Sequence, residues 1–220
     1  PVGGGIDTRV LVAHGQGMQV LRREPELPLS VYMHDLGGTG ITAYGGLLET
    51  GALKDGEQVF VSTAGGAVGS VVGQIAKIKG CHVVGSTGAD DKAAGLRDEA
   101  GLDAVINYKK EPLAEALAAA TPKGIDVYFE NVGGAHLDAA LPRMNVRGRI
   151  PVCGMISTYN GGGEGVRNLF ALIYGRVRME GFVASDFPHL NAQFVDDMTG
   201  WLKSGRVKYQ ETILDGFERA

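Results

Sequence analysis

From residue 58 onward, short apolar runs alternate with longer stretches in which apolar side chains recur at helical spacing. Short apolar runs bounded by glycine and polar residues are typical of strands buried on both faces of a parallel sheet. The stretches between them are typical of helices that cover such a sheet. This pattern predicts strands at residues 58–62, 82–86, 104–107, 126–130, 149–153 and 179–183, and helices at residues 68–79, 89–100, 112–120, 135–140, 166–175 and 190–204.

The regular alternation predicts an α/β fold with a doubly wound, parallel, six-stranded sheet of the Rossmann type, with strand order 3-2-1-4-5-6. Upstream of residue 35 the pattern changes. Residues 9–13 and 18–22 predict two short antiparallel strands, and residues 25–28 are punctuated by proline. Residues 36–48 then predict an apolar helix that leads into the sheet.

Composition narrows the class of protein. The 220 residues are enough for one large or two small domains, and 44% of them are hydrophobic, which supports a substantial core and excludes disorder. A net charge of −4 argues against nucleic acid or an anionic membrane as the main partner. The chain has no apolar run of the ~18 residues that a membrane span needs. Because the chain opens at Pro1 with glycine-rich sequence, we expect it to be a fragment of a longer protein or to be given without unobserved residues.

Two cysteines, Cys81 and Cys153, adjoin apolar runs without C-x-x-C spacing. A reducing, cytoplasmic compartment is the simpler interpretation. Cys153 has no histidine near it in the sequence that would activate it, so we interpret it as a small packing residue rather than a nucleophile.

A glycine-rich turn follows the first predicted strand. The turn reads Ala64-Gly65-Gly66-Ala67-Val68-Gly69, and an amphipathic helix begins within it. Small residues let the backbone approach a dinucleotide pyrophosphate, and the helix N-terminus presents free N–H groups and a positive dipole end. The turn departs from the pattern G-x-G-x-x-G because Ala64 occupies the first glycine position. A glycine turn that serves packing alone is the alternative.

The second predicted strand ends in Val84-Gly85-Ser86-Thr87-Gly88, without a carboxylate. A site that prefers NAD usually places an acid there to bind the ribose 2′-hydroxyl. A 2′-phosphate needs a cation and hydrogen-bond donors instead, and Lys92, in the first turn of the next helix, supplies a charge. The turn and the missing acid together favour NADP. The alternative is that Lys92 is an ordinary solvated lysine, since Asp90 and Asp91 beside it dilute the positive potential.

Several motifs together resemble one family. The chain is similar to the zinc-independent medium-chain dehydrogenase/reductases, in the branch of the NADP-dependent alkenal, prostaglandin and curcumin reductases. The run from Ala64 to Cys81 carries the resemblance together with Asn107-Tyr108-Lys109, Glu130-Asn131-Val132-Gly133-Gly134, the loop from Cys153 to Asn160, Leu27-Pro28-Leu29-Ser30, Thr42-Ala43-Tyr44 and Gly216-Phe217-Glu218.

The resemblance implies a division of the chain. Members carry a GroES-like, β-rich catalytic domain ahead of the nucleotide domain and return to it at the end of the chain. Residues 1–35 would then be the tail of that domain, residues 36–188 the dinucleotide-binding domain, and residues 189–220 a C-terminal helix and the start of the return. The family's Gly-Met-x-Gly sequence in the first helix appears here as Gly37-Gly38-Thr39-Gly40, which is a departure.

The resemblance also implies which residues contact the cofactor. Lys92 and the Tyr108 hydroxyl would contact the 2′-phosphate, and Asn131 would lie near the nicotinamide ribose. The loop after the fifth strand would face the nicotinamide half, and the backbone after the sixth strand would face the carboxamide. The predicted cofactor-binding residues are Gly66, Ala67, Val68, Gly69, Lys92, Tyr108, Asn131, Cys153, Gly154, Ile156, Ser157, Tyr159, Phe182, Val183 and Ala184.

Some of these positions have plainer interpretations. Asn131 precedes two glycines, as turn-forming asparagines do. Residues 182–184 would also be explained by burial against the sheet. Tyr159 is the candidate catalytic residue because its phenol can hydrogen-bond the ribose 2′-hydroxyl or a developing enolate, and the alternative is an aromatic wall without a role in proton transfer.

The implied reaction is NADPH-dependent reduction of the carbon–carbon double bond of an α,β-unsaturated ketone or aldehyde. Hydride would pass to the β-carbon, and a proton would then reach the α-carbon of the enolate. The partner would be a small enone or alkenal, and two copies would pair as a homodimer through the sheet edge at residues 179–183. A non-catalytic NADP-binding module or redox sensor is the alternative, and a methyltransferase-like domain is disfavoured by the missing acid after the second strand.

Other dehydrogenase chemistries lack their motifs. The five histidines show neither H-x-x-x-H nor H-x-E spacing, so we expect no catalytic metal. Two cysteines cannot build the four-cysteine lobe of zinc alcohol dehydrogenases. No tyrosine is followed four residues later by lysine, so the Tyr-x-x-x-Lys pair of short-chain reductases is absent.

Overall fold

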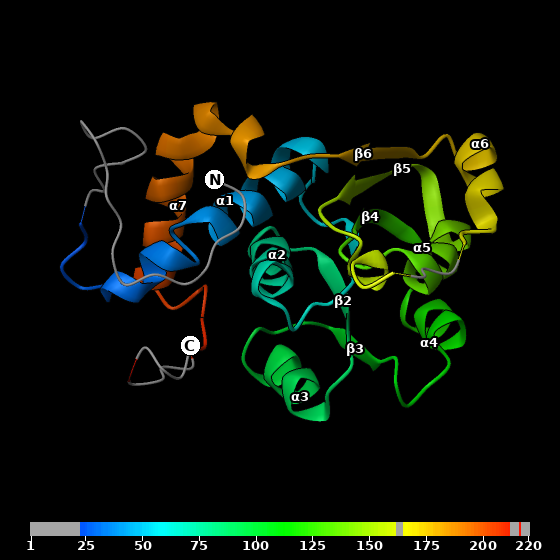
Figure 1. The fold of residues 1–220 in the computed structure, drawn as a ribbon, viewed down its shortest axis with the longest axis horizontal. Coiled ribbons are helices and arrows are strands. Elements are labelled where there is room, and N and C mark those ends of the chain that lie inside the picture. The colour runs from blue at the N-terminus through cyan, green and yellow to red at the C-terminus, as the bar shows by residue number, and fades with distance from the viewer. Residues whose placement is uncertain (1–22, 162–164, 212–215, 217–220) are drawn as a thin grey trace.

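A computed structural model describes residues 23–161, 165–211 and 216 (Figure 1). The predicted strands at residues 9–13 and 18–22 lie outside the described residues, as do Phe217 and Glu218 of the Gly-Phe-Glu motif. The remnants of a β-rich domain and the division at residues 35 and 188 therefore stay predictions.

Six parallel strands form one sheet in the order β3-β2-β1-β4-β5-β6, as predicted. The strands are β1 (Gln58–Val61), β2 (His82–Thr87), β3 (Ala104–Asn107), β4 (Ile125–Phe129), β5 (Met144–Val152) and β6 (Arg178–Gly181). The α-helices are α1 (Gly38–Gly45), α2 (Ala67–Ile78), α3 (Asp90–Asp98), α4 (Leu113–Ala120), α5 (Gly134–Ala140), α6 (Ala171–Gly175) and α7 (Asn191–Lys203).

Successive strand residues alternate between two hydrophobic cores, one on each face of the sheet. Val59 and Val61 join the core that also contains residues of α1, α2, α3 and α7. Phe60 and Tyr128 point to the opposite face and join the core beneath α4 and α5, where their rings stack with centroids 4.8 Å apart. Helices consequently cover both faces of the sheet (Figure 1), which explains why its strands are apolar on both sides.

Most elements lie within one or two residues of their predicted bounds, and three depart further. The predicted helix at residues 166–175 is a 3-10 turn (Asn168–Phe170) followed by the short α6, which ends at Arg176 in a left-handed conformation with a φ of 50°. A π-helical turn (Gly46–Thr50) extends α1. Strand β5 begins five residues earlier than predicted. Its first residues are too polar to be identified as a strand by their pattern, and they belong to the sheet because they pair with β4 across a bulge.

The arrangement of the strands places a crevice at one edge of the sheet. β1 pairs with β2 on one side and with β4 on the other, so the chain reverses its direction of winding between β1 and β4. Ligands of open α/β sheets bind at such a point, outside the carboxyl ends of the strands. Among the described residues, no helix is long and apolar enough to cross a membrane.

Candidate functional site

The turn between β1 and α2 brings backbone donors to the crevice. Thr63 adopts a left-handed backbone with a φ of 52°, which costs ~1–3 kcal/mol, and its carbonyl accepts a hydrogen bond from the Gly66 N–H at 2.9 Å. A Cβ atom on Gly69 would lie 2.3 Å from the Thr63 oxygen, so only glycine lets α2 pack this closely. Gly66 caps α2 without a side-chain hydrogen bond. The first-turn N–H groups of Ala67, Val68 and Gly69 therefore lie at the start of α2 without intrahelical acceptors, as an anion site requires.

A hollow of about 240 Å³ lies beside this turn. It brings together Lys92 and Tyr108, the two predicted 2′-phosphate ligands, and adds Lys109, to which the sequence motifs assign no role. Its lining carries two lysines and no carboxylate, and comprises Thr63, Gly65, Gly66, Thr87, Gly88, Ala89, Lys92, Tyr108 and Lys109.

Close packing places three side chains of the hollow. A Cβ on Gly65 would lie 3.1 Å from Lys92 Cβ, so the Lys92 stem lies against the glycine turn. A Cβ on Gly88 would lie 2.8 Å from Tyr108 Oη and 3.0 Å from Lys109 Cε. The missing side chain at Gly88 is therefore what admits the Tyr108 phenol and the Lys109 stem.

One of the two negative charges at the start of α3 is offset by a neighbouring lysine. Asp90 accepts a hydrogen bond from Asn107 Nδ2 at 2.7 Å and pairs with the Lys110 ammonium group. The Lys110 and Asn107 hydrogen bonds lower the pKa of the Asp90 carboxyl. Asp90 therefore dilutes the positive potential of the hollow less than the sequence alone indicated, because Lys110 compensates its charge.

Asn131 is held by its neighbour strand. Its backbone N–H donates to Ser62 Oγ at 2.9 Å, and its Nδ2 donates to the Ser62 carbonyl at 2.7 Å. Ser62 Oγ in turn donates to Glu130 Oε1 at 3.0 Å, and that carboxylate also accepts the Val132 N–H. Ser62 and Glu130 are both fully buried. Sequence reasoning assigned no role to either, although a polar residue that closes an otherwise apolar strand is a usable signal.

The loop after β5 is fastened to the same turn. The Cys153 and Gly154 N–H groups donate to the Glu130 carbonyl, and the Ile156 N–H donates to the Asn131 carbonyl. Ser157 donates to the Val132 carbonyl from both its N–H and its Oγ. The segments after β1, β4 and β5 thus form one hydrogen-bonded wall of the crevice. Burial raises the pKa of the Cys153 thiol to about 11, which supports its interpretation as a packing residue.

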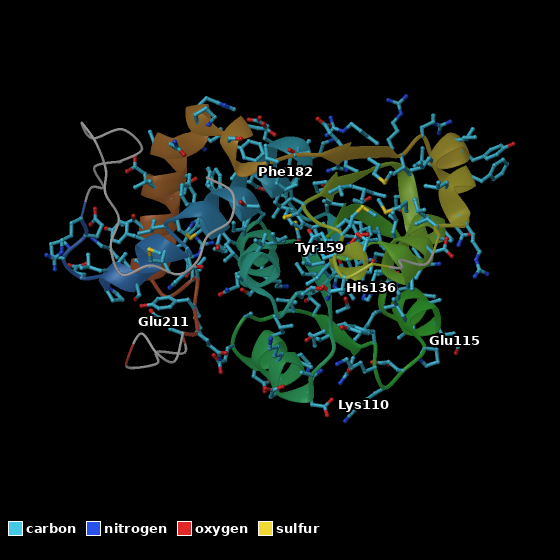
Figure 2. All side chains as sticks on the ribbon, in the orientation of Figure 1. Lys110, Glu115, His136, Tyr159, Phe182 and Glu211 are labelled. Carbon is cyan, nitrogen blue, oxygen red and sulfur yellow. The ribbon has the colours of Figure 1, made fainter. Side chains whose placement is uncertain are left out.

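Tyr159 is exposed over this loop, with 68% of its surface accessible. Its phenol oxygen accepts a hydrogen bond from the Met155 N–H at 3.3 Å, which leaves the hydroxyl proton available for donation. Figure 2 labels Tyr159 near the centre of the view and Lys110 beside α3 at its lower edge.

The segment after β6 is only partly open to a ligand. The Phe182 ring packs against Phe129 and Phe187 and joins the core. The Val183 side chain is exposed, but its backbone N–H donates to Asp186 at 2.9 Å. Of residues 182–184, the structure therefore gives Phe182 the packing role that the plainer interpretation expected.

Comparison with known proteins decides the family. The family model of the zinc-binding dehydrogenases matches residues 67–200, which is more than half of the chain. The chain belongs to this family. It is therefore a member of the medium-chain dehydrogenase/reductase superfamily, as its motifs predicted.

Within this family, the chain is similar to curated NADP-dependent reductases. It is 50% identical to a 2-alkenal reductase (NADP(+)-dependent) of Nicotiana tabacum over 90% of its own length and 58% of that protein. It is 41% identical to an NADPH-dependent curcumin reductase of Escherichia coli (strain K12) over 95% of its length and 62% of that protein. It superimposes on CurA of Vibrio vulnificus in complex with NADPH with a TM-score of 0.83 and 42% identity, over 90% of its length and 61% of CurA. The chain thus spans less than two thirds of the length of these relatives.

The described residues contain no candidate metal site. No group of three or more His, Cys, Asp or Glu side chains is arranged there to hold a metal ion. The zinc-independent chemistry expected from the sequence stays a prediction.

Ser62→Ala tests the hydrogen-bonded wall. This change removes the acceptor of the Asn131 N–H and one donor to the buried Glu130 carboxylate, and each unpaired buried group costs ~1–3 kcal/mol. We expect the free energy of unfolding in urea to fall by at least ~1 kcal/mol. Ser204→Ala, at an exposed position after α7, is the control and should change it by less than ~0.5 kcal/mol. An unchanged midpoint for Ser62→Ala would show that the wall does not depend on this hydroxyl.

Proposed function

We propose that the chain is the NADP-binding part of an NADPH-dependent reductase that acts on the carbon–carbon double bond of α,β-unsaturated ketones or aldehydes. The observation that carries this proposal is the hollow at the end of β2, which holds two lysines and a tyrosine and no carboxylate. A ribose 2′-phosphate needs such a lining, whereas a free 2′-hydroxyl is usually bound by an acid.

The residues present fit the cofactor. The uncapped N-terminus of α2 offers N–H groups and a positive dipole end to a pyrophosphate. Lys92, Lys109 and the Tyr108 hydroxyl lie next to it and offer charge and donors to a 2′-phosphate. Asn131, after β4, and the loop at residues 153–159, after β5, follow along the same edge of the sheet, and there we place the nicotinamide half.

The protein's contribution to the reaction would be positioning and hydrogen-bond donation. Bound NADPH would supply the hydride for the β-carbon of the substrate. The wall made by Ser62, Glu130 and Asn131 orients the side of the crevice that receives the nicotinamide half. The Tyr159 hydroxyl would donate to the enolate oxygen as negative charge develops there.

The sheet edge fits the predicted homodimer. All four residues of β6 are exposed, and an unpaired edge strand is a template for pairing with another chain. Exposed apolar side chains of the neighbouring segment, Phe170, Ile173 and Tyr174, would be buried by a second copy. Free Cys81 and Cys153 fit the reducing, cytoplasmic compartment that we propose.

The second candidate function is NADP binding without catalysis, as in a redox sensor. The observation that supports it is the hollow with two lysines and no carboxylate, which accounts for NADP binding without requiring turnover. Both functions share the cofactor site, and they differ only in whether a substrate is turned over.

A measurement of turnover distinguishes the reductase from the non-catalytic NADP-binding protein. We expect the complete protein to oxidise NADPH in the presence of an enone or alkenal. The measurement is the loss of absorbance of the reduced nicotinamide, made with each member of a panel of such substrates. Saturated ketones are the matched control and should give no turnover. NADPH binding without oxidation on any member of the panel would favour the non-catalytic candidate, and absence of NADPH binding would overturn both.

A further inference from the structure

Helix α5 places a histidine directly behind the predicted 2′-phosphate ligand Tyr108. The rings of His136 and Tyr108 meet edge to face, with centroids 4.9 Å apart and planes at 82°. His136 is 5% exposed, whereas Tyr108 is 38% exposed and lines the hollow. The histidine therefore touches the hollow only through the tyrosine ring.

Tyr108 is consequently held from several sides. Its hydroxyl and Cζ lie over the backbone of Gly88, its N–H donates to the Thr87 carbonyl at 3.2 Å, and its ring contacts His136. His136 is itself anchored, because its N–H donates to the Gly133 carbonyl at the start of α5. The phenol is thereby fixed at the mouth of the hollow, beside Lys109.

One nitrogen of the imidazole makes no hydrogen bond to the residues that the structure describes. His136 Nε2 is buried and has no hydrogen-bond partner among them. A buried unpaired nitrogen is destabilising, so an apolar side chain would serve packing alone better. What histidine offers at this position, and leucine would not, is an aromatic ring in an edge-to-face pair, which is worth more than its buried area.

We propose that His136 is a positioning residue that holds the Tyr108 phenol at the 2′-phosphate hollow and thereby raises the preference for NADPH over NADH. This inference rests on the proposed function, because it assumes that the hollow receives the 2′-phosphate of NADP. It adds a residue on α5, outside the lining of the hollow, that acts on cofactor choice through Tyr108.

Two variants of similar size test the inference. His136→Leu keeps an apolar side chain but loses the aromatic ring, whereas His136→Phe keeps the ring. NADPH and NADH are titrated separately into each protein, with binding followed by nucleotide fluorescence and folding checked by thermal unfolding. We expect His136→Leu to weaken NADPH binding about three- to tenfold without changing NADH binding. His136→Phe should retain the wild-type ratio of the two dissociation constants.

The outcomes distinguish this inference from the proposed function. A wild-type protein that binds both nucleotides equally would overturn the 2′-phosphate hollow itself. A wild-type preference for NADPH that His136→Leu leaves intact would overturn only the role of His136. Equal weakening of both nucleotides by His136→Leu, or loss of the preference in His136→Phe as well, would also overturn it, since the effect would then not run through the aromatic contact.

Discussion

Lys92→Glu will weaken NADPH binding about a hundredfold while leaving NADH binding nearly unchanged. A charge-assisted hydrogen bond contributes ~1.5–3 kcal/mol, and every 1.4 kcal/mol is a tenfold change in the dissociation constant. Charge reversal adds repulsion between the new carboxylate and the 2′-phosphate. NADH lacks that phosphate, so the change should fall on NADPH alone. The measurement is a titration of each nucleotide into wild-type and variant protein.

The control keeps the same change of charge at a distance from the crevice. Lys123 is exposed in the loop before β4, at the amino side of the sheet. Lys123→Glu should leave both dissociation constants unchanged. Raising the ionic strength should reduce the difference between wild type and Lys92→Glu, because salt screens exposed charges. Parallel loss of NADH and NADPH binding by Lys92→Glu would place Lys92 at the pyrophosphate or in the fold rather than at the 2′-phosphate.

Acid should destabilise the protein through His136. Burial lowers the pKa of this imidazole from 6.5 to about 4. Between these two values the unfolded chain binds a proton that the folded chain does not, so stability falls as the pH decreases from about 6.5 towards 4. One pKa unit corresponds to ~1.4 kcal/mol, so the loss attributable to His136 approaches ~3 kcal/mol. Urea unfolding at a series of pH values measures it.

His136→Leu isolates this effect from the carboxylates that titrate in the same range. The variant has no proton to bind at this position, so the difference in unfolding free energy between wild type and variant should grow steadily below pH 6.5. Above pH 7 the variant should be as stable as the wild type or more stable, because it removes the unpartnered Nε2. A difference that does not change with pH would mean that the imidazole is protonated with equal ease in the folded and unfolded chain.

Much of the fold follows from local sequence. Runs such as Val59-Phe60-Val61 are apolar on both faces and separated by amphipathic helices, a pattern that only a parallel sheet covered on both sides can bury. The strand order followed from that alternation and from the place of the glycine turn. The first residues of β5 escaped prediction since they are polar and are held in the sheet by pairing with β4.

Part of the candidate site was likewise predictable from local sequence, and part was not. Glycine turns, a missing acid after β2 and a lysine in the next helical turn are signals along the chain, so they predicted where a dinucleotide and its 2′-phosphate would bind. Lys109 was missed because its place in the hollow depends on the space left above Gly88. The packing role of Phe182 likewise depended on the aromatic rings of other segments.

By itself, the sequence determined the class of fold and the family and predicted the kind of cofactor, because these rest on periodicity and on short motifs whose members are close in the chain. The tertiary structure alone decided how the site is held together. Asn131 is bound by Ser62, sixty-nine residues away, and Tyr108, in the turn after β3, is backed by a histidine on α5. Such contacts form only when parallel strands bring their carboxyl ends to one edge, so the spacing along the chain does not reveal them.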